Sequence, residues 1–533
     1  MYWFLPSFAI NMGITPWELM TYTPRQPSNI MSGAEKQPRS LSFVTTVHGS
    51  VDEAYDFLAQ HVEIAGEEAV DLKKLRRRID WHLMPIMFAL YFFQFLDKFL
   101  LNYAIIMGLP KDLKLKGNEL NNIASSLWWA YLAMSPLVGL IQNKVRIGKW
   151  LGVNMFLWGI VISCTAAVKT YHQFLAIRIL MGVFDSAIPP ALMLLSAQYY
   201  RKDEQAMRYA LWFSSVGWGL ICGGLISFGF QHVHTSTLEG WRIMFLVLGL
   251  ISLIVGVLSF IFMPDTPMAA RFLTDLEKKA LLQHVAVNKT GVSSHNIEWY
   301  QLKELLVDPQ VWLLTLNVII VSAGTGILAI YGATLVKSFG FTAKEASLLE
   351  MPSGVVAVVA TLFFAYAVRQ HWVNRVTASL IGYALSLTGT CMVAFADKTN
   401  KGAMLSGIYM IAFSVPTVGI KYQWIAANVG GHTKRAASTA IVSGAFSIGN
   451  IVAPYAVQKK FAPDFQPARL VLVASKAVAL GVIALLGLYY LFENRRRNKK
   501  YGPAGEQTPD EVNPDDWANM TDKEKQKSFR YVY

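Results

Sequence analysis

Two charged side chains lie inside one long apolar run, residues 173–199, where hydrocarbon disfavours both. Arg178 and Asp185 are seven residues apart with Gly182 between them, so a helix places all three on nearly one face. That separation corresponds to about 10 Å along a helix axis, which is too far for the two charges to pair with each other. Each charge therefore needs a partner on a neighbouring helix, in a water-filled cavity or on a substrate. Ionisable residues in such positions indicate a functional site.

Three further charges, Asp97, Lys98 and Lys421, lie deep in two other apolar runs. Together with the first pair they sum to +1, so we expect a slightly cationic cavity that suits a small anion. Arginine suits a carboxylate because its planar group offers two parallel donors, and either aspartate can carry a proton. The alternative is that these charges only pair structurally between helices.

Polar residues near the deep charges extend the predicted cavity. Asn102 shares a helix face with Lys98 through its i, i+4 spacing. Asn450 is a candidate contact for the substrate, although small polar residues also hold membrane helices together. Glu350 and Lys476 lie nearer the outer ends of their apolar runs, where we expect the side chains to reach the membrane interface.

The composition of the 533 residues, 53% hydrophobic and 16% charged, is typical of a membrane protein. The net charge of +13 is spread over loops and flanks, which favours an anionic lipid surface over nucleic acid as its partner. No P-loop, nucleophile elbow, cofactor motif or set of metal ligands is found, since His232 and His234 lack a third ligand. Aromatic residues are expected mainly at the membrane interfaces, among them Trp128, Trp129, Tyr131 and Trp218.

The positioning elements are apolar runs long enough to cross a bilayer, and the sequence contains twelve of them. They cover approximately residues 84–107, 120–141, 150–168, 173–199, 209–230, 241–263, 311–336, 345–368, 375–396, 402–428, 437–458 and 468–492. The fold is therefore predicted to be an all-α membrane protein with two pseudo-symmetric halves of six transmembrane helices. Pro189 and Pro190 follow Asp185 directly and should free two backbone carbonyls and kink that helix.

The predicted organisation has five parts. These are a largely flexible cytoplasmic N-terminal region at 1–83, a first half at 84–263, a central cytoplasmic loop at 264–310, a second half at 311–493 and a cytoplasmic tail at 494–533. Basic clusters in both flanks and in the central loop fall on one side of the membrane if there are twelve crossings, which makes that side cytoplasmic. The start of the protein, at Met1 or at Met31, stays open.

Particular motifs resemble those of a known family. The segment from Arg178 through Gly182 to Asp185 is similar to the R-x-x-x-G-x-x-E pattern of the anion:cation symporter family within the major facilitator superfamily. Further segments are similar to the fungal allantoate permease branch, and the resemblance covers roughly residues 75–495. These segments are FLDK and LNYA at 95–104, RKDEQAMRYALW at 201–212, PDTPMAARFLT at 264–274, NVGGHTKR at 428–435 and GNIVAP at 449–454.

The resemblance implies roles for the deep charges, since helices 1, 4, 7 and 10 line the central cavity in this superfamily. Arg178 takes the role of the anion-binding or salt-bridging cation, and Lys98, Asn102, Lys421 and Asn450 complete the predicted substrate site. By the resemblance Asp185 takes the role of the proton-coupling carboxylate, and the pattern of deep charges makes Asp97 a second candidate for it. Two departures from the family pattern stand out: Asp185 replaces a glutamate, and Asn143 stands in the loop motif where the superfamily has an aspartate.

The function predicted from the resemblance is proton-coupled uptake of a small organic anion across the plasma membrane, by a monomer with both termini in the cytoplasm. Allantoate and other ureido acids, vitamin-like carboxylates, amino acids and small peptides are the candidate substrates. One alternative is export of a metabolite by proton antiport, although Leu220 stands where the antiporter motif G-P-x-x-G-G has proline. A nutrient-sensing receptor is a further alternative, and such receptors usually carry a larger cytoplasmic domain than residues 494–533.

Overall fold

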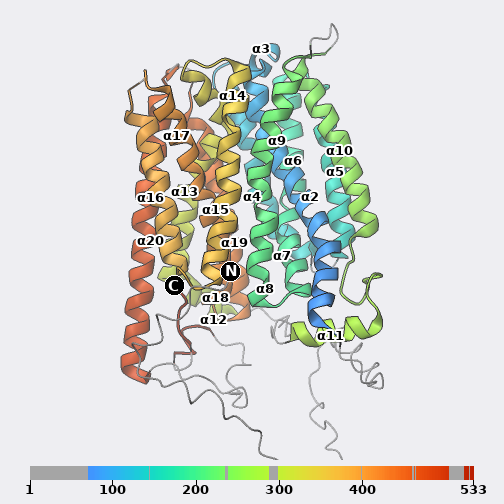
Figure 1. Ribbon diagram of the computed structural model, residues 1–533, viewed down its shortest axis with the longest axis vertical. Helices are drawn as coiled ribbons and strands as arrows, with labels where there is room; N and C mark the ends of the chain where they lie inside the picture. Colours follow the sequence, from blue (N-terminus) through green and yellow to red (C-terminus); the bar gives the residue numbers. More distant parts are fainter. Residues whose placement is uncertain are drawn as a thin grey trace, which may run out of the picture. The chain divides into compact units, whose positions relative to one another are not determined.

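A computed structural model describes residues 70–142, 145–233, 238–286, 298–397, 399–458, 461–462, 464–502, 521–526 and 529–533. The predicted flexible N-terminal region up to residue 69, the question of the start, Asn143 and His234 lie outside the described residues. All regular secondary structure in the described part is helical (Figure 1). The helices belong to the unit Asp52–Tyr533.

The first half, called the N-half below, holds the helices that carry Asp97, Lys98, Arg178 and Asp185. Its elements are α2 (Leu72–Ile106), α3 (Leu109–Asp112), α4 (Glu119–Gln142), α5 (Ile147–Thr165), α6 (Tyr171–Asp185), α7 (Ile188–Tyr199), α8 (Lys202–Phe213), α9 (Ser215–Phe230) and α10 (Gly240–Phe262). Two helices, α11 (Asp275–Ala286) and α12 (Trp299–Leu306), lie in the connection to the second half. The first membrane-crossing helix starts at Leu72 and not near 84, because Asp71 caps it by accepting the N–H groups of Lys73 and Lys74.

The second half, called the C-half, repeats the arrangement of six crossing segments. Its elements are α13 (Pro309–Ser338), α14 (Ala343–Leu349), α15 (Met351–Arg369), α16 (Arg375–Phe395), α17 (Lys401–Ile411), η1 (Ala412–Ser414), α18 (Val415–Asn428), α19 (His432–Val452), η2 (Ala453–Ala456) and α20 (Gln466–Tyr501). Eleven segments of the described chain are long and apolar enough to cross a membrane. The 24 residues of α4 correspond to about 36 Å and supply the twelfth crossing, which confirms the predicted fold class.

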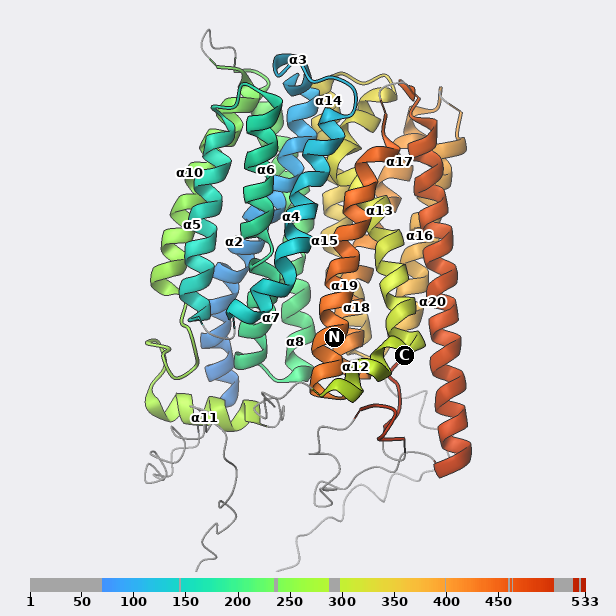
Figure 2. The same ribbon diagram turned by 180° about the vertical axis from the view of Figure 1, so that it is seen from behind.

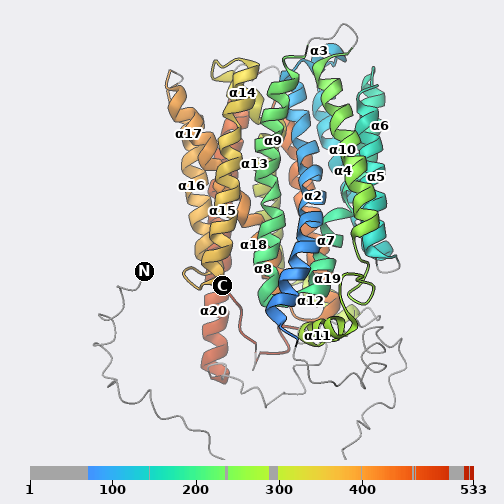
Figure 3. The same ribbon diagram turned by 45° about the vertical axis from the view of Figure 1, so that its right-hand side comes forward.

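The two halves meet along two lines of helix contact. On one face of the bundle α9 lies beside α15 (Figures 1 and 3), and on the opposite face α4 lies beside α19 (Figure 2). Between these lines α2 packs against α13. We call the end of the bundle with α3 and α14 the upper end and the end with α11 and α12 the lower end, as they are drawn in Figure 1.

The predicted kink after Asp185 is confirmed, since α6 ends at that residue and α7 starts at Ile188. The amide of Gln94 donates to the freed carbonyl of Asp185 at 3.1 Å, and a second glutamine side chain, Gln142, donates to the Ala187 carbonyl at 2.7 Å. Side chains of neighbouring helices thus satisfy two of the backbone carbonyls near the break, as a membrane interior favours. The break fixes the carboxyl end of α6 against α2, where Gln94 lies.

A close approach at Gly182 holds α6 against α4. A Cβ atom added to this glycine would lie 2.1 Å from the backbone carbonyl oxygen of Leu127, so no side chain fits there. The two helices pack along much of their length. Because Gly182 shares its helix face with Arg178 and Asp185, this contact turns the charged face of α6 toward α4.

The C-terminal residues pack onto the lower end of the C-half. Asp522 is fully buried and accepts hydrogen bonds from Lys434 at 2.7 Å and from the Tyr531 hydroxyl at 2.7 Å. Burial raises the pKa of Tyr531 well above its ordinary value, and the charge of Asp522 raises it further. The hydroxyl therefore stays protonated and acts as the hydrogen-bond donor to Asp522. The backbone carbonyl of Val532 accepts from the indole of Trp424 at 2.9 Å. Part of the predicted tail is therefore a component of the folded C-half.

Three carboxylates gather at this lower end around a single ammonium group. Glu304, Asp308 and Asp522 have oxygens close enough together to hold a metal ion. The Nζ atom of Lys434 lies 2.8, 2.6 and 2.7 Å from them, respectively, and is itself fully buried. Lys434 thus pairs with all three carboxylates, and its single positive charge offsets one of their three negative charges.

Candidate functional site

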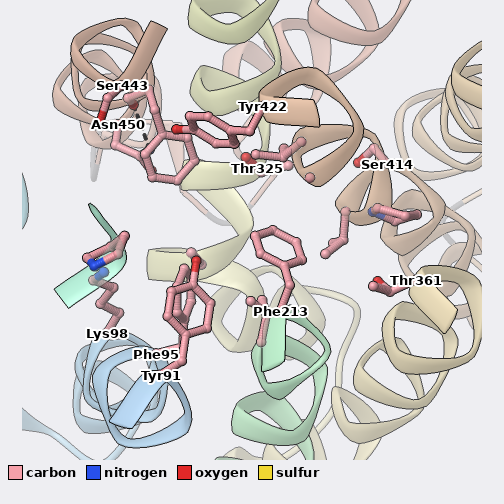
Figure 4. A pocket seen from close by; sticks show the side chains of 18 of the residues that line it. Tyr91, Phe95, Lys98, Phe213, Thr325, Thr361, Ser414, Tyr422, Ser443 and Asn450 are labelled. Carbon is pink, nitrogen blue, oxygen red and sulfur yellow. Dashed lines mark hydrogen bonds between the residues drawn. The ribbon is translucent and has the colours of Figure 1, made fainter. Parts of the chain in front are cut away.

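A cavity of about 390 Å³ lies between the two halves. Its wall runs from Glu350 near the upper end to Val368 and Thr439 near the lower end. Figure 4 shows Lys98 on the N-half side, and Tyr422 opposite it on a helix of the C-half. The wall is largely apolar and aromatic with a few polar groups, which is the usual character of a site for a small molecule.

Polar groups from both halves face each other in this cavity. The lining residues that bear a polar or charged side chain include Tyr91, Lys98, Tyr131, Ser135, Arg178, Thr325, Glu350, Ser353, Thr361, Ser414, Tyr422, Gln423, Ser443 and Asn450. They come from α2, α4, α6, α13, α15, α18 and α19, from η1, and from the junction before α15. A ligand in the cavity would contact both halves at once.

The ammonium group of Lys98 is the most accessible of the predicted deep charges. Its side chain is 10% exposed, and its Nζ atom lies 2.9 Å from Oδ2 of the fully buried Asp185. The same ammonium lies 4.5 Å from the ring centroid of Phe95 and 5.1 Å from that of Trp128. The amide of Gln94 donates to the other carboxylate oxygen of Asp185. Lys98 thus faces the cavity while its counter-ion lies behind it.

Arg178 forms a second and looser pair with Asp97. Nη1 of the arginine lies 3.9 Å from Oδ2 of the aspartate, beyond hydrogen-bond distance, and both side chains are almost completely buried. Neither carboxylate oxygen of Asp97 has a hydrogen-bond partner in the described part of the chain. Phe174 covers the guanidinium at 5.7 Å. The prediction that Arg178 and Asp185 do not pair with each other is confirmed, and of the partners left open for each charge the structure shows one on a neighbouring helix.

The structure brings Asp97, Lys98, Arg178 and Asp185 into one cluster of two crossed pairs between α2 and α6. The four formal charges in this cluster cancel. Opposite charges held within ion-pair distance stabilise one another in a low dielectric. Each group in the cluster therefore stays charged only while its oppositely charged partner lies beside it. Any anion that reaches Lys98 must therefore compete with Asp185.

Lys421 lies apart from that cluster. Its side chain is fully buried, it does not line the cavity, and its Nζ atom has no hydrogen-bond partner in the described part of the chain. It lies instead over the ring of Tyr383 on α16, 5.3 Å from the centroid. Because the other four deep charges cancel, the net charge of +1 expected for the cavity belongs to Lys421, which lies behind the cavity wall.

The expectation that Glu350 and Lys476 reach the membrane interface is wrong. Glu350 is 3% exposed and lines the cavity, where both of its oxygens accept from the Asn102 amide at 3.1 and 2.9 Å. Lys476 is fully buried and donates to the Ser414 hydroxyl at 3.1 Å. The position of a charge along an apolar run indicates its depth, whereas its rotation about the helix decides whether it faces lipid or protein. Asn102 itself is not part of the cavity wall and binds Glu350 instead.

Asn450 lines the cavity, but its amide nitrogen donates within its own helix, to the Phe446 carbonyl at 2.9 Å. Its Oδ1 atom would lie 2.7 Å from a Cβ at Gly326, which shows close packing against α13. Both interpretations of this residue, cavity lining and helix packing, therefore apply.

Sequence reasoning missed most of the aromatic wall. Trp128 and Tyr131 line the cavity, although the sequence assigned them mainly to the membrane interface. Trp129 and Trp218 are 58% and 43% exposed on the outside of the bundle. Spacing from the charged residues could have found Tyr91, which lies seven residues before Lys98 and therefore on the same helix face.

Hydrogen bonds between the halves close the upper end above the cavity. Besides the Asn102 and Glu350 contact, they join Tyr331 to Asn121, Asn121 to the Val457 carbonyl, Tyr455 to Asn122 and Gln231 to Ser347. The cavity wall in contrast extends into the lower turns of α15 and α19. The site is thus shut off from the upper end by polar contacts that two separating halves would break.

A family model described as Major Facilitator Superfamily matches residues 87–454, well over half of the chain. The chain belongs to this superfamily. A solved structure of a bacterial homolog to the human lysosomal transporter Spinster, in an inward-facing and unoccupied conformation, aligns with a TM-score of 0.57. That alignment has 14% sequence identity and covers 80% of this chain and 97% of the other, so it supports the fold alone.

Two transporters of Saccharomyces cerevisiae are similar to this superfamily member over most of their length. The thiamine pathway transporter THI73 is 33% identical over 478 residues, which are 88% of this chain and 89% of the relative. The allantoate permease is 31% identical over 503 residues, 92% of this chain and 91% of the relative. The predicted resemblance to the allantoate permease branch is confirmed. The protein is a multi-pass membrane transporter of the secondary class and not an enzyme.

Proposed function

We propose that this transporter is a proton-coupled importer of a small organic anion, and that it acts as a monomer in the plasma membrane with both termini in the cytoplasm. The observation that carries the proposal is the Lys98 ammonium at the cavity wall, paired at 2.9 Å with a carboxylate that is fully buried. The relatives supply the substrate classes to test, because one is named for allantoate and the other for the thiamine pathway.

Coupling follows from competition for Lys98. A substrate carboxylate that binds the ammonium from the cavity takes the place of Asp185, whose carboxylate is then buried without a cation. A buried carboxylate without a partner is far more costly than a neutral acid, so Asp185 takes up a proton as the anion binds. Binding of the anion and binding of the proton thereby favour each other, and the linkage is reciprocal.

The second pair works in the same direction. Arg178 lines the cavity, and its contact with Asp97 is 3.9 Å, too long for a hydrogen bond, so a bound anion can compete for the guanidinium. A planar guanidinium and an ammonium on adjacent helices offer a carboxylate a bidentate partner and a point charge. Asp97 then becomes the second candidate to hold a proton.

Energetics favour the proton as coupling ion. With the cell interior negative, importing one negative charge alone costs roughly 2.3 kcal/mol per 100 mV, and one accompanying proton cancels that cost. The two halves would then rock around the cavity, opening the upper end while the lower end closes. Because the lower end carries the basic flanks, we assign it to the cytoplasm.

The test is uptake of labelled ureido acids, vitamin-like carboxylates and amino acids into cells that express the protein, at acidic and neutral pH, with and without an uncoupler. Lys98→Ala and Arg178→Ala should abolish accumulation, and Asp185→Asn should abolish concentrative uptake while sparing exchange of substrate. Lys111→Met, at an exposed lysine of α3, is the matched control and should transport normally. Uptake that is indifferent to pH and uncoupler would disprove proton symport, and uncoupler-sensitive efflux would indicate the exporter.

A further inference from the structure

Glu350 is a buried acid at the boundary between the two halves. It stands between α14 and α15, ends the first helix and starts the second, and lines the cavity from near the upper end. Its carboxylate oxygens lie 3.1 and 2.9 Å from the Asn102 amide nitrogen on α2. This contact joins the N-half to the C-half.

A third helix completes the surroundings of this acid. Oδ1 of Asn102 accepts a hydrogen bond from the Ala333 backbone N–H at 3.0 Å, which ties α2 to α13. A Cβ added to Gly332 would lie 2.0 Å from Oε1 of Glu350, so the backbone of α13 lies directly against the carboxyl group. Three helices from both halves thus meet at this single side chain.

The groups that face Glu350 carry no positive charge. From α2 they are the Asn102 amide, which donates to the carboxyl group, and the Tyr103 phenol, whose one O–H donates to the Leu220 carbonyl of α9 at 3.1 Å. From α13 they are backbone atoms. No lysine or arginine of the described residues lies within ion-pair distance of Glu350. The nearest deep cation along α2, Lys98, is engaged by Asp185.

The three buried acids of the transport pathway therefore differ in whether a cation lies beside them. Asp185 and Asp97 each have a cation, at 2.9 and 3.9 Å, whereas Glu350 has only neutral donors. Removing an ionised carboxylate from water without a cation is costly, and the neutral acid avoids that cost. The conformation with a closed upper end thus favours Glu350 with a proton bound.

We propose that Glu350 is a proton-carrying residue of the transport cycle and that its protonation is required to close the upper end. The inference rests on the proposed function as a proton symporter. When the upper end opens, α2 leaves α13 and α15, so water reaches the acid and it can ionise. On closure it must hold a proton, and its contact with the cavity gives that proton a route toward the lower end.

The test compares Glu350→Gln, which mimics the neutral acid, with Glu239→Gln at an exposed residue whose side chain caps no helix. The Glu350 variant should lose accumulation above the equilibrium value and lose the pH dependence of uptake, while exchange of labelled for unlabelled substrate persists. The Glu239 variant should keep all three. Wild-type pH-dependent accumulation in Glu350→Gln would overturn the inference and leave the proposed function intact. A wild-type protein without pH or uncoupler dependence would overturn both.

A second test uses the wild-type protein alone, so it does not depend on whether a variant folds. A hydrophobic carbodiimide adds to protonated carboxyl groups, so peptide mapping after treatment in membranes should find the adduct on Glu350 and not on Asp185. Labelling should fall as the pH rises. Because Glu350 lines the cavity, the reagent has access to it. An adduct on Asp185 with none on Glu350 would refute the assignment.

Discussion

The pair of Lys98 and Asp185 makes a stability prediction that does not depend on the identity of the substrate. Lys98→Met removes the cation that is paired with a fully buried carboxylate, which leaves Asp185 with Gln94 as its hydrogen-bond partner. Breaking a buried ion pair in this way costs about 3–5 kcal/mol, because the remaining charge is uncompensated. Asp185→Asn leaves the charge on Lys98, which is 10% exposed at the cavity wall between two aromatic rings. We expect that variant to lose only the charged hydrogen bond, about 1.5–3 kcal/mol.

The double variant Lys98→Met/Asp185→Asn separates the pair from its surroundings. It contains neither charge, so it should be about as stable as Asp185→Asn and clearly more stable than Lys98→Met. The coupling energy in this cycle should then equal the cost of Lys98→Met, about 3–5 kcal/mol. Lys278 and Asp275 form the matched control, since they lie 2.9 Å apart on α11 with the aspartate 60% exposed. Their cycle should give a coupling energy below about 1 kcal/mol.

The assay is the fraction of purified protein that stays monodisperse in detergent after heating, measured for the wild type, both single variants and the double variant. The test is the rank order of the four proteins by their resistance to heating. The free energies given above set the size of the differences that we expect. If Lys98→Met is as stable as the double variant, Asp185 does not depend on Lys98 for its charge. The competition mechanism would then lose its basis.

Two further predictions concern packing. Gly182→Ala should destabilise the protein by about 1–3 kcal/mol, because its Cβ would lie 2.1 Å from a backbone carbonyl of α4, whereas Gly481→Ala, with no atom within 4 Å, should melt like the wild type. Equal melting of the two glycine variants would contradict the close approach of α6 to α4. Asp522→Asn weakens the attachment of the C-terminal residues to Lys434, so limited proteolysis should cut near the C-terminus faster than in the wild type. An unchanged cleavage rate would show that this contact does not hold the segment.

The sequence predicted the crossing segments well because the length of an apolar run is a direct consequence of bilayer thickness. It also predicted that Arg178 and Asp185 do not pair with each other, since their separation along one helix forbids it. The actual partners could not be deduced. The crossed pairing depends on how far α2 is rotated and on how closely Gly182 lets α6 approach α4, and neither quantity is encoded in local periodicity.

Glu350 shows a different limit of the sequence. Counted along its apolar run it lies near an end, which is where a charged side chain usually reaches the interface. In the structure the run is interrupted at this very residue, between α14 and α15, and the side chain turns into the boundary between the halves. Its partner, Asn102, is 248 residues away, so only the packing of two halves brings the pair together.

The distribution of charge changes how anion binding should be understood. The sum of +1 from the sequence suggested a cavity that attracts anions by excess positive charge. In the structure the cations at the wall, Lys98 and Arg178, already have carboxylate partners, and the excess charge of Lys421 lies behind the wall. In the mechanism that we propose, an anion therefore gains Lys98 when Asp185 gives it up, and Asp185 gives it up by taking a proton. In this mechanism the proton is a requirement of substrate binding itself, and the driving force for accumulation follows from that requirement.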